Sequence, residues 1–146
     1  VIATEGTIRN GAWENKLKEK IQNIEVINKA CPMLATIAEE GRATGEEGRK
    51  AIKEYMEIFK KNKINKIILG CTHFPIYEQV IRDELEYEVE LINTGKTVAK
   101  KLKKYLKEKE LLKEKENSKI EINLTKEEKE FTKIAQNILQ FDYNKK

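Results

Sequence analysis

The residues of this chain best suited to chemistry lie in the segment LGCTHFP, residues 69–75. This segment places Cys71, one of only two cysteines, two residues before His73, the only histidine. A thiol and an imidazole that lie close together can exchange a proton near neutral pH. The pair formed by Cys71 and His73 is therefore a candidate site for proton transfer.

A structural role is the alternative for both side chains. Free cysteine is among the most buried residue types, so a cysteine at the end of a strand can simply fill the core. Thr72 favours a functional role, because it supplies a hydroxyl and a backbone N–H at a helix start, where the helix dipole stabilises an anion such as a thiolate. Glu39 follows the second expected strand and can reach the same region. Cys31 is expected to belong to the core or to the wall of the site.

Two signals place the Cys71 and His73 pair on a turn between a strand and a helix. The apolar run at residues 67–69 predicts a buried strand that ends just before Cys71. Pro75 suits the first turn of the helix that follows, since its missing N–H is not needed there. The pair is therefore expected at the carboxyl end of a strand.

Strands and helices are expected to alternate along the first two thirds of the chain. Strands are predicted at residues 1–4, 24–30, 64–69 and 89–92, and helices at residues 10–21, 33–40, 44–61 and from residue 76 onward. This alternation predicts an α/β fold: a parallel sheet with right-handed crossovers and helices on both faces, in three layers. The strand ends near residues 4, 31 and 71 then open on one edge of the sheet, where ligands bind.

Local signals refine these elements. Gly6 and Thr7 are expected to form a turn, and Gly41 to end a helix in the left-handed conformation. Thr44, followed three residues later by Glu47, predicts a capping box. The expected apolar faces are Trp13, Leu17 and Ile21 in the first helix, and Ala51, Ile52, Tyr55, Met56 and Phe59 in the third.

The chain changes character after residue 93. A lysine-rich helix is predicted at residues 97–112, a charged connector at 113–118, a strand at 120–124 and a helix at 126–139, which together form a helix-strand-helix tail. The string TGKT at residues 94–97 does not complete a phosphate-binding loop, because that pattern requires glycine where Glu90 stands. Thr94 is instead expected to cap the helix after it.

Composition describes a soluble chain with a basic tail. The 146 residues are 39% hydrophobic and 37% charged, with no apolar run long enough to span a membrane. Residues 1–93 carry 14 basic and 16 acidic side chains, whereas residues 94–146 carry 15 and 9. A solvated lysine face at residues 100–107 is favoured over nucleic-acid binding, since only four of 29 basic residues are arginine. The two cysteines lack metal-site spacing and are expected to be free thiols in a reducing cytoplasm.

Three blocks of sequence resemble a known enzyme family. They are residues 3–13 (ATEGTIRNGAW), residues 30–32 (ACP) with Glu39 and Gly41 downstream, and residues 69–75 (LGCTHFP). In this order and spacing they resemble the glutamate racemases of the aspartate/glutamate racemase family, and the last block is the most specific. The expected strand and helix after residue 120 fit the family more loosely.

The resemblance implies an isomerase that interconverts L- and D-glutamate without a cofactor or metal and supplies D-glutamate for bacterial peptidoglycan. Members of the family use two cysteines on opposite faces of the substrate. One thiolate removes the α-proton and the other thiol delivers a proton to the opposite face. The implied substrate is thus a small molecule, with no nucleic acid or membrane partner and with a homo-oligomer possible.

By position, the resemblance assigns roles to five residues. Cys71 is similar to the second catalytic cysteine, His73 to the group that assists it, and Glu39 to a carboxylate that supports this half of the site. Thr72 and Thr7 are similar to contacts with the substrate.

The other catalytic cysteine of the family has no match in this sequence. Cys31 does not correspond to it, since in the family that cysteine belongs to an amino-terminal segment with an Asn-Thr motif. Residues 1–93 resemble the second of the family's two α/β domains, and residues 94–146 resemble the returning part of the first. Two positions depart from the usual pattern: Asn93 stands where the family tends to have aspartate, and Trp13 where it tends to have tyrosine.

The 146-residue chain, which begins at Val1, is expected to be a piece of a longer protein and to be inactive as a racemase by itself. Two other readings of its function stay open. A related racemase for aspartate or hydantoins would use the same pair of thiols. A basic α/β module that binds nucleic acid would use the lysine-rich helix instead.

Overall fold

The computed structural model describes residues 1–113 of the chain. The chain divides into two compact units, residues 1–99 and residues 100–146. The first unit holds the sheet and all of the predicted site residues. The strand expected at residues 120–124 and the helix expected at 126–139 lie outside the described residues.

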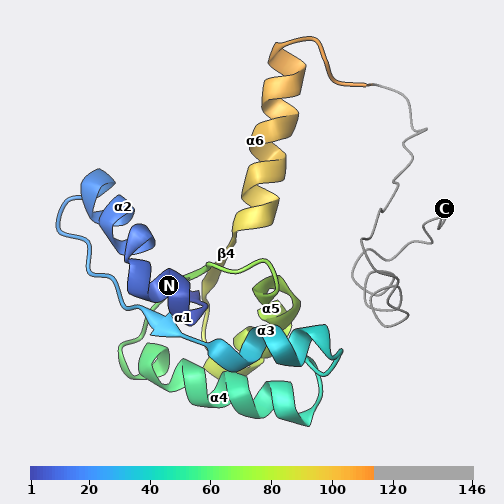
Figure 1. The fold of residues 1–146 in the computed structure, drawn as a ribbon. Helices are drawn as coiled ribbons and strands as arrows, with labels where there is room; N and C mark the ends of the chain where they lie inside the picture. The colour runs from blue at the N-terminus through green and yellow to red at the C-terminus, as the bar shows by residue number, and fades with distance from the viewer. Residues whose placement is uncertain (114–146) are drawn as a thin grey trace. The chain divides into compact units, whose positions relative to one another are not determined.

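A four-stranded parallel sheet organises the first unit (Figure 1). Its strands are β1 (Ile2–Ala3), β2 (Lys29–Ala30), β3 (Lys66–Leu69) and β4 (Glu90–Asn93), in the order β2-β1-β3-β4. The predicted parallel α/β fold is confirmed. The second strand is shorter than predicted, because β1 offers it only two residues to pair with.

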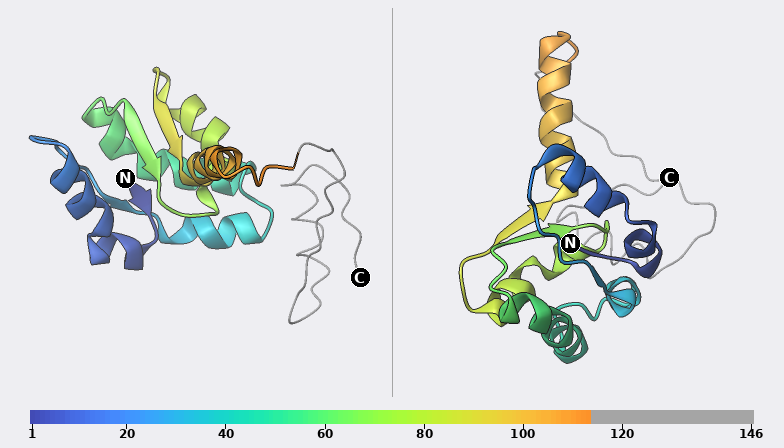
Figure 2. Two further views of the ribbon diagram at one scale, coloured as in Figure 1. Left: turned by 90° about the horizontal axis from the view of Figure 1, so that it is seen from above. Right: turned by 90° about the vertical axis from the view of Figure 1, so that its left-hand side faces the viewer.

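Helices cover the sheet from two sides. They are α1 (Glu5–Asn10), α2 (Ala12–Lys20), α3 (Pro32–Glu39), α4 (Glu46–Lys61), the 3₁₀ turn η1 (Phe74–Tyr77) and α5 (Glu78–Leu85). A further helix, α6 (Thr94–Glu108), follows β4 and buries none of its residues. Helices α3 and α5 both pack against α4, and α1 packs against β1 and β2. Right-handed crossovers in this strand order place α1 and α2 on one face and α3, α4 and α5 on the other, as Figures 1 and 2 show.

The first helical segment differs from the prediction. Gly6 and Thr7 form no turn, because both lie inside α1. The chain breaks instead at Gly11, whose φ of +68° is left-handed and favours glycine. The apolar stripe predicted for this segment is not a core face: Ile21 is 48% exposed and α2 buries none of its residues.

Helix α4 supplies the predicted core face but begins differently. Ile52, Tyr55, Met56 and Phe59 are buried, and Ala51 is partly buried against them. The predicted capping box is wrong. The N-cap is Gly45 rather than Thr44, and the Glu47 carboxylate pairs with Arg42. The loop before the helix passes so close that a Cβ on Gly48 would lie 1.9 Å from the Ala43 carbonyl oxygen.

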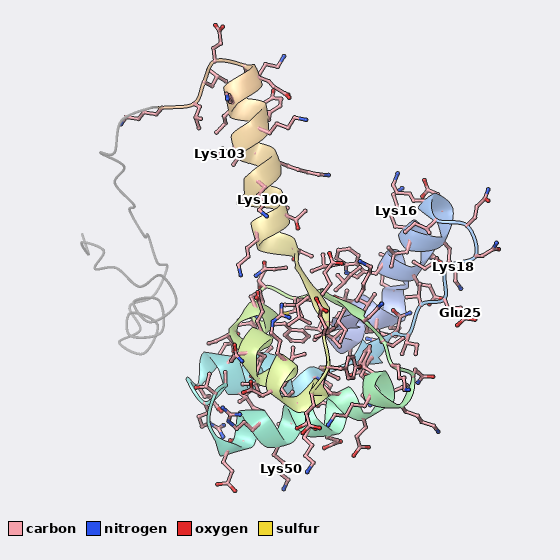
Figure 3. All side chains as sticks on the ribbon, turned by 180° about the vertical axis from the view of Figure 1, so that it is seen from behind. Lys16, Lys18, Glu25, Lys50, Lys100 and Lys103 are labelled. Atoms are coloured by element: carbon pink, nitrogen blue, oxygen red, sulfur yellow. The ribbon has the colours of Figure 1, made fainter. Side chains whose placement is uncertain are left out.

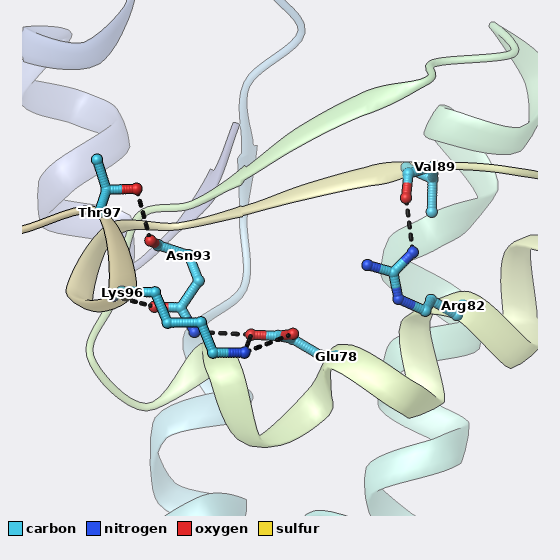
Figure 4. A network of polar contacts seen from close by, with 6 residues as sticks. All are labelled: Glu78, Arg82, Val89, Asn93, Lys96 and Thr97. Atoms are coloured by element: carbon cyan, nitrogen blue, oxygen red, sulfur yellow. Dashed lines mark hydrogen bonds and ion pairs between the residues drawn. The ribbon is translucent and has the colours of Figure 1, made fainter. Parts of the chain in front are cut away.

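Asn93, rather than the predicted Thr94, caps α6 (Figure 4). The Asn93 side-chain oxygen accepts a hydrogen bond from the Lys96 N–H at 3.0 Å, while its amide nitrogen donates to the Glu78 carboxylate at 2.7 Å. The Lys96 ammonium also contacts both Glu78 oxygens at 3.3 Å. An aspartate at position 93 could cap the helix, but it could not donate to Glu78.

Several lysine side chains project from the helices (Figure 3). Lys16 and Lys18 on α2, Lys50 on α4, and Lys100 and Lys103 on α6 are all exposed. The predicted solvated lysine face is therefore present on the part of α6 that the structure describes.

Candidate active site

The candidate site lies where the strand order changes direction. The chain leaves β1 toward β2 on one side and then crosses to β3 on the other side of β1. In parallel sheets ligands bind at such a switch point, outside the carboxyl ends of the two strands. Thr4 directly follows β1, and Cys71 comes two residues after the end of β3, so both lie at this edge.

Gly70 lets the two strand ends approach closely. Its N–H donates to the Ile2 carbonyl at 2.8 Å. A Cβ at this position would lie 3.0 Å from that oxygen, and 3.1 Å from both the Ala3 Cβ and the Trp13 indole nitrogen. Trp13 of α2 therefore lies beside the residue that precedes the thiol. Only the three-dimensional structure reveals this contact, since Trp13 reads in sequence as one residue of a helical stripe.

A tight turn carries the thiol and the imidazole. The Phe74 N–H donates to the Cys71 carbonyl at 3.2 Å and starts η1. Phe74 and Tyr77 lie on one side of this 3₁₀ segment, where residues three apart eclipse, and both are buried. The Tyr77 hydroxyl donates to the Leu34 carbonyl at 2.7 Å, and burial raises the pKa of Tyr77 to about 12. The turn is thus anchored in the core, with Pro75 near the start of a 3₁₀ segment rather than of an α-helix.

Three predicted residues, Cys71, His73 and Glu39, lie in contact in that order, through a hydrogen bond between Cys71 and His73 and an ion-pair contact between His73 and Glu39. The Cys71 Sγ lies 3.7 Å from His73 Nδ1, and His73 Nε2 lies 3.1 Å from a Glu39 carboxylate oxygen. Helix α3, which ends at Glu39, brings the carboxylate to the turn.

The nearby carboxylate favours one tautomer of the imidazole. The negative charge of Glu39 beside Nε2 favours a proton on that nitrogen, and a neutral Nδ1 can then accept the thiol proton. Transfer of the thiol proton to Nδ1 then produces a thiolate beside an imidazolium that Glu39 partly balances. The His73 and Glu39 side chains are 37% and 64% exposed, so their pairing is worth about 1 kcal/mol or less.

The two predicted threonines lie at the same sheet edge but in different contacts. Thr7 is on α1, and its hydroxyl lies 3.0 Å from that of Thr4 at the end of β1. Thr72 lies between Cys71 and His73 and is exposed. In the described part of the chain, neither threonine hydroxyl has a hydrogen bond to the thiol, and their role as substrate contacts stays a prediction.

Cys31 is part of the core, as its position after the second strand indicated. It is fully buried at the end of β2, and its thiol donates to the Lys29 carbonyl with a sulfur to oxygen distance of 3.6 Å. Burial raises the pKa of the Cys31 thiol to about 12. Both cysteines are free. Residues 1–113 contain no cluster of three or more His, Cys, Asp or Glu side chains that could hold a metal ion.

Comparison with known proteins identifies relatives over most of the chain. The profile of the Asp/Glu/Hydantoin racemase family matches residues 1–102. Glutamate racemase from Aquifex aeolicus is 39% identical over 107 residues, which are 73% of this chain and 41% of the relative. Glutamate racemase from Carboxydothermus hydrogenoformans is 33% identical over 144 residues, 99% of this chain and 53% of the relative.

Solved structures agree with these matches. The crystal structure of glutamate racemase from Francisella tularensis in complex with D-glutamate superposes with a TM-score of 0.87 at 31% identity, covering 99% of this chain and 54% of that one. The chain therefore spans about half the length of the racemases it resembles. Among the described residues, no helix is both long and apolar enough to cross a membrane.

Proposed function

Because the chain belongs to the Asp/Glu/Hydantoin racemase family, we propose that it forms half of an enzyme that interconverts L- and D-glutamate by proton transfer between thiols. The observation that carries this proposal is the series of contacts from Cys71 to His73 and from His73 to Glu39 at the sheet's switch point. Supplying D-glutamate for peptidoglycan in the cytoplasm is the role we propose for the reaction.

Cys71 acts on one face of the substrate α-carbon in this mechanism. His73 first takes the thiol proton, and Glu39 stabilises the imidazolium that forms. The Cys71 thiolate then removes the α-proton of the substrate. Inversion requires a proton from the opposite face, because a single base returns the proton to the face it came from. Thr72 and Thr7, at the same edge, bind the charged groups of glutamate.

The thiol on the opposite face comes from outside this sequence. The only cysteine of the chain besides Cys71 is Cys31, which is buried in the core, and burial raises the pKa of its thiol to about 12. We assign residues 1–93 to one domain of the enzyme and residues 94–146 to the returning part of the other. The 146-residue chain alone is therefore expected not to racemise glutamate.

A domain transplant tests the proposal. Residues 1–93 replace the matching region of the Carboxydothermus hydrogenoformans racemase, and α-proton exchange into deuterated water is followed by NMR with L- and D-glutamate. The chimera is expected to racemise glutamate, its Cys71→Ser variant is not, and a Cys31→Ala variant serves as the matched control that stays active.

Two results would contradict the proposal. A chimera that folds but exchanges the α-proton of aspartate or of a hydantoin, and not of glutamate, would refute the assigned substrate. Racemisation by the unaccompanied 146-residue chain would refute the need for an external thiol, unless sedimentation shows a dimer that pairs two copies of Cys71.

A further inference from the structure

We propose that Cys71 is also an acyl-accepting nucleophile, which gives the chain a hydrolytic activity toward small activated esters. This activity goes beyond racemisation and needs no second thiol. It follows from the order of groups after β3: a nucleophile, a base and a carboxylate that orients the base. The same order serves covalent catalysis in unrelated hydrolases.

The distances connect the three groups in the required order. Cys71 Sγ lies 3.7 Å from His73 Nδ1, and His73 Nε2 lies 3.1 Å from the Glu39 carboxylate. The nucleophile also stands at the end of β3, directly before a tight turn that leads into a helical segment. Such a strand-to-helix turn holds the nucleophile outside the sheet edge.

Backbone donors next to the thiol can stabilise the charge that develops on an ester oxygen. Thr72 and His73 are the two central residues of the turn that the Phe74 N–H closes onto the Cys71 carbonyl. Within residues 1–113, no backbone hydrogen bond is found from either of their N–H groups. These two N–H groups are the donors that an oxyanion bound beside Sγ would use.

The two cysteines of the chain differ in their exposure to solvent. Cys71 is partly exposed, and the side chain of its neighbour His73 is 37% exposed, so a small ester can reach the thiol from solvent. Cys31 has no exposed surface and stays protonated, since burial raises its pKa. Acylation is therefore confined to Cys71.

The reaction runs in two balanced steps. In the first, His73 takes the thiol proton, Sγ forms a bond to the acyl carbon of a p-nitrophenyl ester, and the carbon–oxygen bond to nitrophenolate breaks. His73 then releases that proton to solvent. In the second step, neutral His73 takes a proton from the water that attacks the thioester, the carbon–sulfur bond breaks, and His73 returns the proton to the departing sulfur, which leaves the carboxylic acid and the thiol. Glu39 is a positioning residue in both steps.

The test uses the 146-residue chain with p-nitrophenyl acetate. We expect a burst of one nitrophenolate per chain and an acetyl group that peptide mapping places on Cys71. Cys71→Ser abolishes the burst, and Cys31→Ala, the matched control, retains it. His73→Asn slows acylation about 100-fold. Glu39→Gln slows acylation and Glu39→Asp restores part of the rate, which a residue that only supports the fold would not do.

Two outcomes would overturn the inference. In the first, the unmodified chain releases nitrophenolate no faster than the Cys71→Ser variant does, although iodoacetamide still labels Cys71. This result would show that the thiol is accessible but does not accept acyl groups. The other is an acetyl group found by peptide mapping on lysine or Cys31 rather than on Cys71. Neither outcome depends on racemisation. If the chimera does not racemise glutamate but the 146-residue chain still gives the nitrophenolate burst, only the proposed function is refuted.

Discussion

Replacing Gly48 by alanine is expected to destabilise the first unit strongly. Helix α4 crosses the preceding loop here, and the new Cβ would lie 1.9 Å from the Ala43 carbonyl oxygen and 2.5 Å from its carbonyl carbon. Ordinary carbon to oxygen contacts begin at about 3.3 Å, so the helix backbone at position 48 and the loop at Ala43 must move apart by more than about 1 Å. Ala43 is buried, and the displaced loop cannot move without opening the core around it.

The expected cost can be set from these contacts. Overpacking of a core costs about 1 to 3 kcal/mol or more, and the better helix propensity of alanine returns about 1 kcal/mol. We expect Gly48→Ala to lower the free energy of unfolding by about 2 kcal/mol, the upper end of the difference between these values. In urea this is a midpoint shift on the order of 1 to 2 M, followed by far-ultraviolet circular dichroism.

Gly6→Ala is the matched control for this substitution. Gly6 also lies in a helix, but a Cβ there meets no atom within 4 Å. Alanine should therefore leave stability unchanged or raise it by up to about 1 kcal/mol. Unfolding free energies for the two variants within about 0.5 kcal/mol of each other would refute the contact at Gly48. Because the same loop follows Glu39, Gly48→Ala should also lower the rate at which Cys71 reacts with iodoacetamide.

Three further predictions concern the core thiol, the helix cap and the turn. Burial raises the pKa values of Cys31 and Tyr77 from 9.0 and 10.0 to about 12, so the unfolded chain loses these protons first. Stability should therefore fall between pH 9 and pH 12, by up to about 1.4 kcal/mol per pH unit for each group, and Cys31→Ala should flatten the fall in urea titrations. Asn93→Asp replaces the donor to Glu78 with a second carboxylate, and should lower the free energy of unfolding by about 1 kcal/mol at neutral pH. At pH 3 the carboxylates are protonated, and thermal melts of the variant and the original chain should agree. Gly70→Ala, in the transplanted racemase, should lower kcat on the order of 10-fold because the Cys71 turn must shift; unchanged kcat would show that the close approach there has no catalytic role.

Much of the fold follows from periodicity in the sequence. Helix α4 is predictable over its whole length, since its buried residues recur at helical spacing and pack on one face. The parallel sheet follows from the alternation of elements. The N-cap of α4 does not follow from the sequence, because Thr44 and Gly45 are both acceptable N-cap residues. The close approach of the loop at Ala43 to Gly48 constrains the chain just before the helix.

The candidate site shows the same division between local and tertiary information. The sequence alone determined that Cys71 and His73 share a turn, because residues so close in the chain remain neighbours in any compact conformation. It could not determine that Glu39 faces the other nitrogen of the imidazole, or that Trp13 lies against Gly70. Both contacts depend on the strand order β2-β1-β3-β4, which brings the end of α3 and the start of α2 to the carboxyl end of β3. Only the tertiary structure decides such contacts, because side chains far apart in sequence meet only where packing places their elements side by side.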